Sequence, residues 1–154
     1  MMAPTHKGFG ILLALVLIND FSLIGLVIAS FGSLMPDIDH PQSVLGRYVK
    51  PLGRYLSHRG FTHSLIGFMS FSVLLLAPVY YFEINIKYSY FFMVGYASHL
   101  IADMMNVSGI PLFWPDLQRI RILRISTGKL GETVFLGCIY LGIIYKLYSL
   151  FFNI

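Results

Sequence analysis

Long apolar segments alternate with short polar ones along the chain, and this alternation predicts a bundle of membrane helices. Three apolar segments, residues 64–82, 89–107 and 133–152, each approach the roughly 20 residues that cross the hydrocarbon core of a bilayer. Pro78 falls in the first of them, where we expect a kink, because membrane helices tolerate proline. Lys146 lies inside the third and must reach either the interface or a partner.

A fourth apolar stretch, residues 9–35, is interrupted by Asn19 and Asp20. A single helix through this stretch would place Asp20 near the middle of the membrane, where an unpaired carboxylate is costly. Two shorter segments joined by a turn would bring both residues to the membrane surface, and both residue types favour turns. We therefore expect two segments, with one continuous span as the alternative, and four or five membrane helices in total.

Composition agrees with one all-α membrane domain over residues 1–154. The chain is 56% hydrophobic and 12% charged, which is about half the charged fraction of an ordinary soluble domain. Its length suits a single domain. Cys138, the only cysteine, lies in an apolar segment and permits no internal disulfide. The predicted fold class is therefore an all-α, polytopic helical membrane protein.

Basic residues gather in two of the polar segments, residues 36–60 and 108–132, and they predict the orientation. These residues are Arg47, Lys50, Arg54 and Arg59 in the first segment, and Arg119, Arg121, Arg124 and Lys129 in the second. Basic loops stay cytoplasmic, so we expect both segments, and the N-terminus, on the cytoplasmic side of a bacterial-type inner membrane. The N-terminal segment lacks a small-residue cleavage pattern, so we expect it to be retained. The net charge of +4 then reflects topology and membrane lipids as partners, with no nucleic acid as the primary partner.

All five histidines and three of the seven acidic residues fall in four short clusters. The clusters are His6; Asp37, Asp39 and His40; His58 and His63; and His99 and Asp103. The predicted topology brings all four to one membrane face, although His6 would leave the group if residues 9–35 formed a single span. Ionisable residues are costly near a bilayer, and these types bind divalent ions. A polar metal site at the cytoplasmic face is therefore predicted.

The spacing of the donors supports this prediction in two clusters. His99 and Asp103 are one helical turn apart, so they share a face and can bind one ion, with a simple hydrogen-bonded pair as the alternative. The prolines that bound residues 36–41 favour a turn or extended backbone, and the donors between them suit a divalent ion. A solvated capping turn is the alternative there. The candidate metal ligands are His6, Asp37, Asp39, His40, His63, His99 and Asp103.

The HRGFTHS segment, residues 58–64, leads into the apolar segment 64–82. Helix N-termini favour anions, and the planar guanidinium of Arg59 suits a phosphate or carboxylate group. His63 is a candidate ligand, and His58 is a candidate second ligand or acid–base group. Anchoring of Arg59 and His58 among lipid headgroups is the alternative.

The order of the motifs TH, LMPDIDHP, HRGFTHSL, GYASHLIADMMN and GIPLFWP resembles the YdjM-like family of inner-membrane proteins regarded as metal-dependent hydrolases. The resemblance runs from Thr5 to about Gly128. That family is similar to zinc-dependent phospholipase C and related single-strand nucleases, helical enzymes whose HxxxD motifs hold a zinc cluster. His99 and Asp103 match this spacing. The resemblance therefore implies a helical metal-dependent hydrolase with a phosphoester substrate.

Two functions are consistent with these patterns. The first is a membrane-embedded metal-dependent hydrolase, a phosphoesterase acting on a lipid or lipid-linked substrate through a metal-activated water. Zinc is the expected ion, as one or two ions, with manganese and magnesium as alternatives; Asp39 or His58 would move protons and Arg59 would bind the anion. The alternative is a non-catalytic regulatory or interaction protein with a structural metal site. Ion transport would need ionisable residues spread through the spans; their concentration at one surface argues against it, and only Lys146 and Asp20 would fit.

Overall fold

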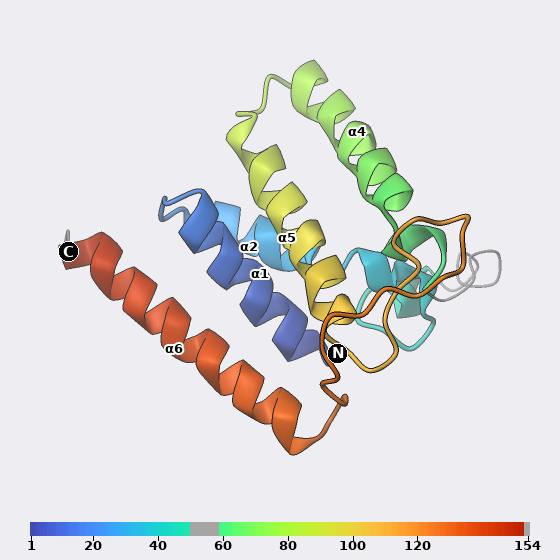
Figure 1. Ribbon diagram of the computed structural model, residues 1–154. Coiled ribbons are helices and arrows are strands. Elements are labelled where there is room, and N and C mark those ends of the chain that lie inside the picture. The colour runs from blue at the N-terminus through green and yellow to red at the C-terminus, as the bar shows by residue number, and fades with distance from the viewer. Residues whose placement is uncertain (50–58, 153–154) are drawn as a thin grey trace.

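The computed structural model describes residues 1–49 and 59–152, and the regular secondary structure of these residues is helical (Figure 1). The α-helices are α1 (Ala3–Leu17), α2 (Leu23–Gly32), α4 (Leu65–Tyr81), α5 (Lys87–Met104) and α6 (Leu130–Phe152). Short 3₁₀ turns are η1 (Pro36–Asp39), η2 (Gly46–Tyr48) and η3 (Phe61–His63). Isolated β-bridges join Asn106 to Ile125 and Ile110 to Ile120. The all-α fold class is confirmed.

The predicted interruption of residues 9–35 is also confirmed. Helix α1 ends before Asn19, which has a φ of +52°, a left-handed conformation that asparagine adopts more readily than most residues. Helix α2 then begins after Ser22, whose hydroxyl accepts a hydrogen bond from the backbone N–H of Gly25 at 3.1 Å. The turn therefore rests on local chemistry that the sequence already displays.

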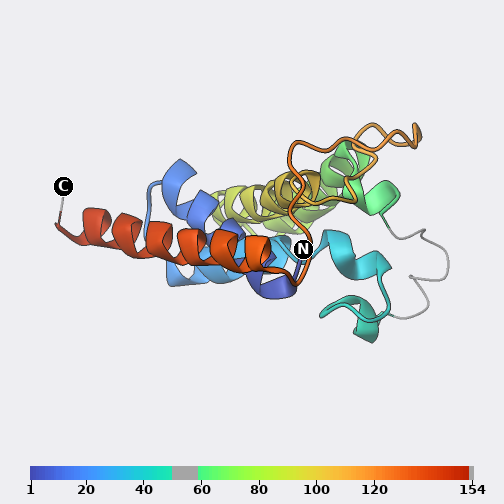
Figure 2. The same ribbon diagram turned by 60° about the horizontal axis from the view of Figure 1, so that its bottom comes forward.

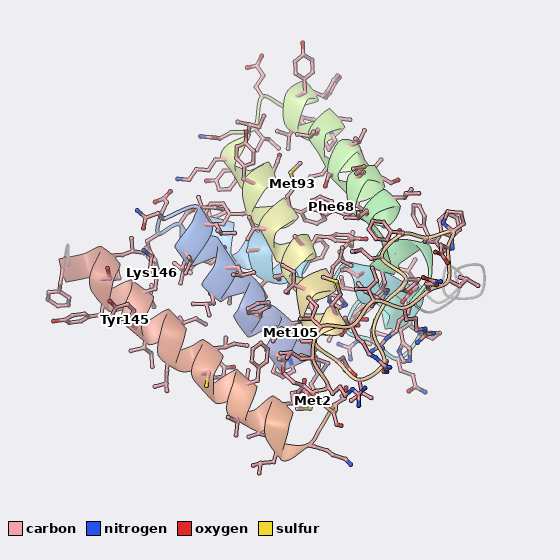
Figure 3. All side chains as sticks on the ribbon, in the orientation of Figure 1. Met2, Phe68, Met93, Met105, Tyr145 and Lys146 are labelled. Carbon is pink, nitrogen blue, oxygen red and sulfur yellow. The ribbon has the colours of Figure 1, made fainter. Side chains whose placement is uncertain are left out.

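Helix α5 is the centre of the bundle. It packs against α1, α2 and α4, while α6 packs along α1 (Figures 1 and 2). Phe68 of α4 points toward α5, where its ring centroid lies 5.6 Å from that of Tyr96 (Figure 3). The two buried clusters are Ala14, Leu15, Leu26, Ala29 and Phe91, and Phe92, Tyr96, Leu100 and Ile110. Helix α5 is thus held by three other helices.

The outer faces of the helices are apolar. Leu23 of α2, Val73 of α4 and Leu141 of α6 are all about 70% exposed, and such extensive exposed apolar surface is unusual for a soluble monomer. Among the helices of the described residues, α6 is long and apolar enough to cross a membrane, judged by length and composition. Helices α1, α2 and α4 are apolar but shorter. The surface indicates membrane association, and the number of spans stays a prediction.

Two lysines hold the turn between α1 and α2 against the other helices. Lys146 of α6 donates a hydrogen bond to Oδ1 of Asn19 at 2.8 Å (Figure 3). Lys87, at the start of α5, forms an ion pair with Asp20. Lys146 was expected either to reach the membrane interface or to find a partner. The structure shows a partner, Asn19, in the turn that interrupts residues 9–35.

Glycine allows α2 and α5 to touch one turn before His99. A Cβ atom on Gly95 would overlap the carbonyl oxygen of Ala29, so no other residue fits without separating the helices. This contact sets the distance between α5 and the end of α2. It therefore also sets the position of His99 against α2.

Gly95→Ala is expected to lower the free energy of unfolding by about 1–3 kcal/mol, the usual cost of overpacking a rigid contact. Gly137→Ala on α6 is the matched control, because a Cβ there meets no atom within 4 Å. That substitution should be neutral or stabilise by up to about 1 kcal/mol through helix propensity. Thermal unfolding of the detergent-purified protein measures both, and equal midpoints for the two variants would contradict the close contact.

Candidate metal centre

A group of buried ionisable side chains lies at one end of the bundle, where the N-terminus, the 3₁₀ turns and the end of α5 meet (Figure 2). Five residues from distant parts of the chain supply potential ligand atoms. Two sets of three could hold an ion, each with its ligand atoms within 4.8 Å of one another: His6, Asp37 and His99, and His63, His99 and Asp103. His99 is common to both sets.

Two carboxylate oxygens lie near a pair of imidazole nitrogens. The Nε2 atoms of His63 and His99 are 3.3 Å apart, and Oδ1 of Asp37 lies 3.5 Å and 3.7 Å from these two nitrogens. Oδ2 of Asp103 lies 3.7 Å and 3.9 Å from the same nitrogens. Zinc bonds of about 2.0–2.1 Å in a tetrahedron place ligand atoms about 3.3–3.4 Å apart. The observed spacing is slightly wider than this and suits a small divalent ion.

The buried ring of His99 is oriented by the backbone of α2. Its Nδ1 lies 2.6 Å from the carbonyl oxygen of Ser33. A carbonyl oxygen only accepts, so Nδ1 carries the proton and donates, and the lone pair of Nε2 points into the site. Only one nitrogen of His99 is therefore available for a metal. Because both ligand sets need that nitrogen, the geometry favours a single ion.

His63 is oriented by Asp39 in a similar way. Nδ1 of His63 lies 3.1 Å from the hydroxyl of Thr62 and 3.4 Å from Oδ2 of Asp39. The same Oδ2 accepts hydrogen bonds from the Thr62 hydroxyl at 2.7 Å and from the backbone N–H of Arg59 at 2.9 Å. A carboxylate behind the outer nitrogen of an imidazole is typical of metal sites. The structure thus places Asp39 behind His63, with Nε2 of His63 facing Nε2 of His99.

The cluster attracts positive charge. Burial lowers the pKa of His63, but hydrogen bonds to Asp37 and Asp39 outweigh it and raise the pKa to about 9. Burial raises the pKa of Asp37, but its hydrogen bond with His63 and the charges of the surrounding imidazoles hold it well below its usual range. A proton and a divalent ion therefore compete for Nε2 of His63.

His6 is buried beside His99 and Asp103 without a hydrogen bond to its ring nitrogens among the described residues. The ring stacks on that of His99 with centroids 3.7 Å apart, and Nε2 lies 3.4 Å from Oδ1 of Asp103. Buried polar nitrogens are normally hydrogen-bonded, and each exception needs an explanation such as an ion. The ring fits a metal-binding cluster for this reason.

Arg59 and the amino group of Met1 both contact Asp103. The Met1 amino group donates a hydrogen bond to Oδ1 at 2.8 Å, and Nη2 of Arg59 lies 3.4 Å from Oδ2. Arg59 has a φ of +59°, a left-handed conformation that is uncommon for a long side chain and costs free energy. The hydrogen bond from its backbone N–H to Asp39 helps to hold this conformation, which directs the guanidinium toward the site.

A pocket of about 400 Å³ opens beside the cluster, and Asp37, His40, Arg59 and Asp103 line part of it. This volume lies within the usual range for small-molecule sites. His40, a predicted ligand, lies on the pocket wall outside both ligand sets, and its Nδ1 accepts a hydrogen bond from the backbone of Gln42 at 3.3 Å. His58, the predicted acid–base group, lies outside the described residues.

Three contributors to the site were not identified from the sequence. Ser33 acts through a backbone carbonyl, for which no sequence signal exists. Thr62 stands just before a predicted helix, where hydroxyl residues are common, so the sequence does not reveal its hydrogen bond to Asp39. Glu132 is fully buried and accepts hydrogen bonds from the backbone N–H of Met2 at 2.6 Å and the hydroxyl of Thr5 at 2.9 Å. These bonds hold the start of α1, and with it His6, in place. The sequence feature that could have identified Glu132 is the position of an acidic residue next to an apolar segment.

The fold and the cluster define a helical, membrane-associated protein with a buried His–Asp site that could bind a divalent metal. The chain belongs to the YdjM inner membrane protein family, whose model matches residues 1–151.

Relatives in this family are similar over part or most of the chain. Inner membrane protein YdjM of Escherichia coli (strain K12) is 40% identical over 101 residues, which cover 58% of this chain and 48% of the relative. The YdjM protein of Shigella flexneri gives the same values. The chain thus spans about half the length of these relatives. YvsG of Bacillus subtilis (strain 168) is 40% identical over 125 residues, 78% of this chain and 76% of YvsG. No solved structure matches.

Asp39→Asn is expected to weaken zinc binding by about 10–100-fold, the usual effect of losing a carboxylate behind a ligating histidine. The amide keeps the shape but not the charge that orients His63. Asp116→Asn is the matched control, because Asp116 is exposed and accepts a hydrogen bond from the backbone of Gln118. Competition with a zinc chelator measures both affinities, and equal values would contradict this role of Asp39.

Zinc binding near pH 7 is expected to release about one proton, because zinc requires a neutral imidazole. With a pKa of about 9, His63 carries a proton at that pH, and zinc must displace it. Since the raised pKa favours the protonated form, zinc affinity should increase as the pH rises toward 9. Calorimetric titrations in buffers of different ionisation enthalpy count the protons, and no dependence on the buffer would contradict the expectation.

Proposed function

We propose that this protein is a multi-pass inner-membrane hydrolase that uses one divalent ion, most suitably zinc, to cleave a phosphoester at the cytoplasmic face. The observation that carries the proposal is that the imidazole nitrogens of His63 and His99 lie 3.3 Å apart, with a carboxylate oxygen of Asp37 and one of Asp103 close to both, beside a pocket. Mixed nitrogen and oxygen donors suit zinc, whereas magnesium prefers six oxygen ligands.

His63, His99 and Asp103 would hold the ion, because all three are buried and their ligand atoms lie together. Two histidines and one carboxylate form a common catalytic zinc set, which leaves a coordination position open. Asp37 is more exposed, with 22% of its side chain accessible, and it lines the pocket. This difference in exposure argues for an open site more than for a closed structural one.

The residues around the ion have separate tasks in this proposal. A divalent ion bound there supplies Lewis acidity that lowers the pKa of water and stabilises charge on phosphoryl oxygens. Asp37, kept ionised by the imidazoles around it, orients the attacking water by accepting its hydrogen bond. Arg59 binds the phosphoryl oxygens with its planar guanidinium. Asp39 holds His63 in position and does not contact the substrate.

A lipid or lipid-linked substrate is favoured by the surfaces around the pocket. The outer faces of α2 and α6 are apolar, and α6 is long enough to cross a bilayer. The site end of the bundle also carries the segments that are rich in basic residues, such as Arg47 and Arg119, which indicates the cytoplasmic side. A substrate held in the bilayer would reach the pocket from the headgroup region.

Elemental analysis of the purified protein, followed by a turnover screen over lipid and nucleotide phosphoesters, tests the proposal. The expected result is about one zinc ion per chain and hydrolysis that stops with a chelator and returns with zinc. Absence of bound metal after zinc loading would refute the site. Bound zinc without hydrolysis of any phosphoester would instead support the non-catalytic alternative, in which the ion is structural.

A further inference from the structure

A second cavity, of about 550 Å³, lies between α1, α2 and α6. Its lining includes Lys7 and Ile11 of α1, Ser30 of α2, and Tyr140 and Ile143 of α6. The groups on its walls are mostly apolar, and its volume falls within the usual range for ligand pockets.

The cavity adjoins the pocket at the candidate metal centre. Ala3 and Val44 line both spaces. From Ala3 the wall continues along α1 to Ile11, a distance of about 12 Å at the helical rise. The two spaces thus lie next to each other, the first polar and at the metal end, the second apolar and along the helices.

The charges are arranged to suit an anion at the polar end. Arg59 lines the pocket beside Asp103, and Lys7, which follows the metal-site residue His6, lines the apolar cavity. A cationic group beside a hydrocarbon wall suits an amphiphile whose anionic head and apolar tail are joined directly. The exposed apolar faces of α2 and α6 flank the cavity and would allow a chain to enter from a bilayer.

We propose that the cavity between α1, α2 and α6 binds the hydrocarbon chain of a phosphate-headed lipid whose phosphate lies at the metal site. The proposal rests on the proposed function for the role of the metal site, but it makes a separate claim about what binds and where. The substrate is then a lipid whose hydrocarbon chain extends from the phosphate along α1. A water-soluble phosphoester would leave this cavity unused.

Photo-crosslinking of the full-length protein in detergent micelles tests the position of the chain. The probe is a long-chain alkyl phosphate that carries a diazirine at the far end of its chain. We expect cross-links to concentrate on the cavity segments of α1 and α6, near Ile11 and Ile143. Dialkyl phosphatidic acid and a polyprenyl phosphate, used as competitors, distinguish the two natural sources of such chains.

Ser30→Phe is designed to fill the cavity, and we expect it to reduce cavity labelling by about tenfold, equivalent to about 1.4 kcal/mol of binding free energy. Ser70→Phe is the matched control, because Ser70 lies on the exposed face of α4. If Ser30→Phe fails to fold, Val44→Trp takes its place, since Val44 lies in a turn that also lines the cavity. Zinc content should be unchanged in all three variants.

Cross-links spread evenly over the outer faces of α4 and α6, with no loss in Ser30→Phe, would overturn the proposal. The outcome is separable from that of the proposed function. Labelling of the cavity without any phosphoester hydrolysis would retain the lipid site and reject the hydrolase. Hydrolysis of soluble phosphoesters at full rate in Ser30→Phe, without cavity labelling, would retain the hydrolase and reject the lipid site.

Discussion

Purified His99→Ala protein is expected to contain no stoichiometric metal and to show no metal-dependent hydrolysis. His99 belongs to both sets of potential ligands, so its removal leaves neither set complete. One of the three proposed protein ligands contributes roughly a third of about 10–16 kcal/mol, or about 3–5 kcal/mol, so affinity should fall by about 10²–10⁴-fold. Elemental analysis after zinc loading measures the amount of zinc bound per chain.

Two further variants separate loss of the metal from loss of the fold. Ser98→Ala is adjacent on α5 and removes only the hydrogen bond from its hydroxyl to the carbonyl of Gly95, so it should retain zinc. Asp103→Asn keeps the volume of the side chain but removes its charge, so it should lose most of the zinc while its thermal unfolding stays cooperative. Retention of stoichiometric zinc by both His99→Ala and Asp103→Asn would show that the ion binds elsewhere.

The helices could be predicted because their signals are local. Apolar length alone located the segment 133–152, which the structure shows as α6 (Leu130–Phe152). Turn chemistry located the break at Asn19 and Asp20. The ion pair between Asp20 and Lys87 was not predicted, because which helix end faces a turn depends on packing between distant segments.

The grouping of His6, His63 and His99 could be anticipated from topology, because helix ends on one side of a membrane share a depth. The roles of Asp37 and Asp39 could not be separated in this way. These residues are two positions apart, and in η1 one faces Nε2 of His63 while the other lies behind Nδ1. That difference depends on the dihedral angles of a 3₁₀ turn and on where η3 packs, neither of which a residue pattern contains.

Backbone contributions lie furthest from sequence reasoning. The carbonyl of Ser33 fixes the proton of His99, yet any residue at that position offers the same atom. The left-handed backbone of Arg59 is equally hidden, since glycine, the residue that marks this conformation, stands one position later, at Gly60. Sequence patterns thus pointed to the side chains of both ligand sets but also to His40, which lies outside them, and packing decided which atoms face the site.

Arg59→Gly is expected to reduce kcat/KM for phosphoester hydrolysis by about 10²–10³-fold, the usual cost of removing one group that stabilises charge in a transition state. The protein should at the same time become no less stable. Glycine adopts a positive φ without strain, and it keeps the backbone N–H that donates to Asp39. Zinc content should also be unchanged, because Arg59 contributes no ligand atom.

Arg59→Lys distinguishes the charge from the shape of the guanidinium. Lysine keeps one positive charge but cannot offer two parallel donors, so its kcat/KM should lie between those of the wild type and Arg59→Gly. Steady-state kinetics on one phosphoester, with zinc content and the unfolding midpoint measured on the same preparations, make the comparison. A loss of zinc that parallels the loss of activity in Arg59→Gly would show that Arg59 acts by positioning Asp103, 3.4 Å away, and not by binding the substrate.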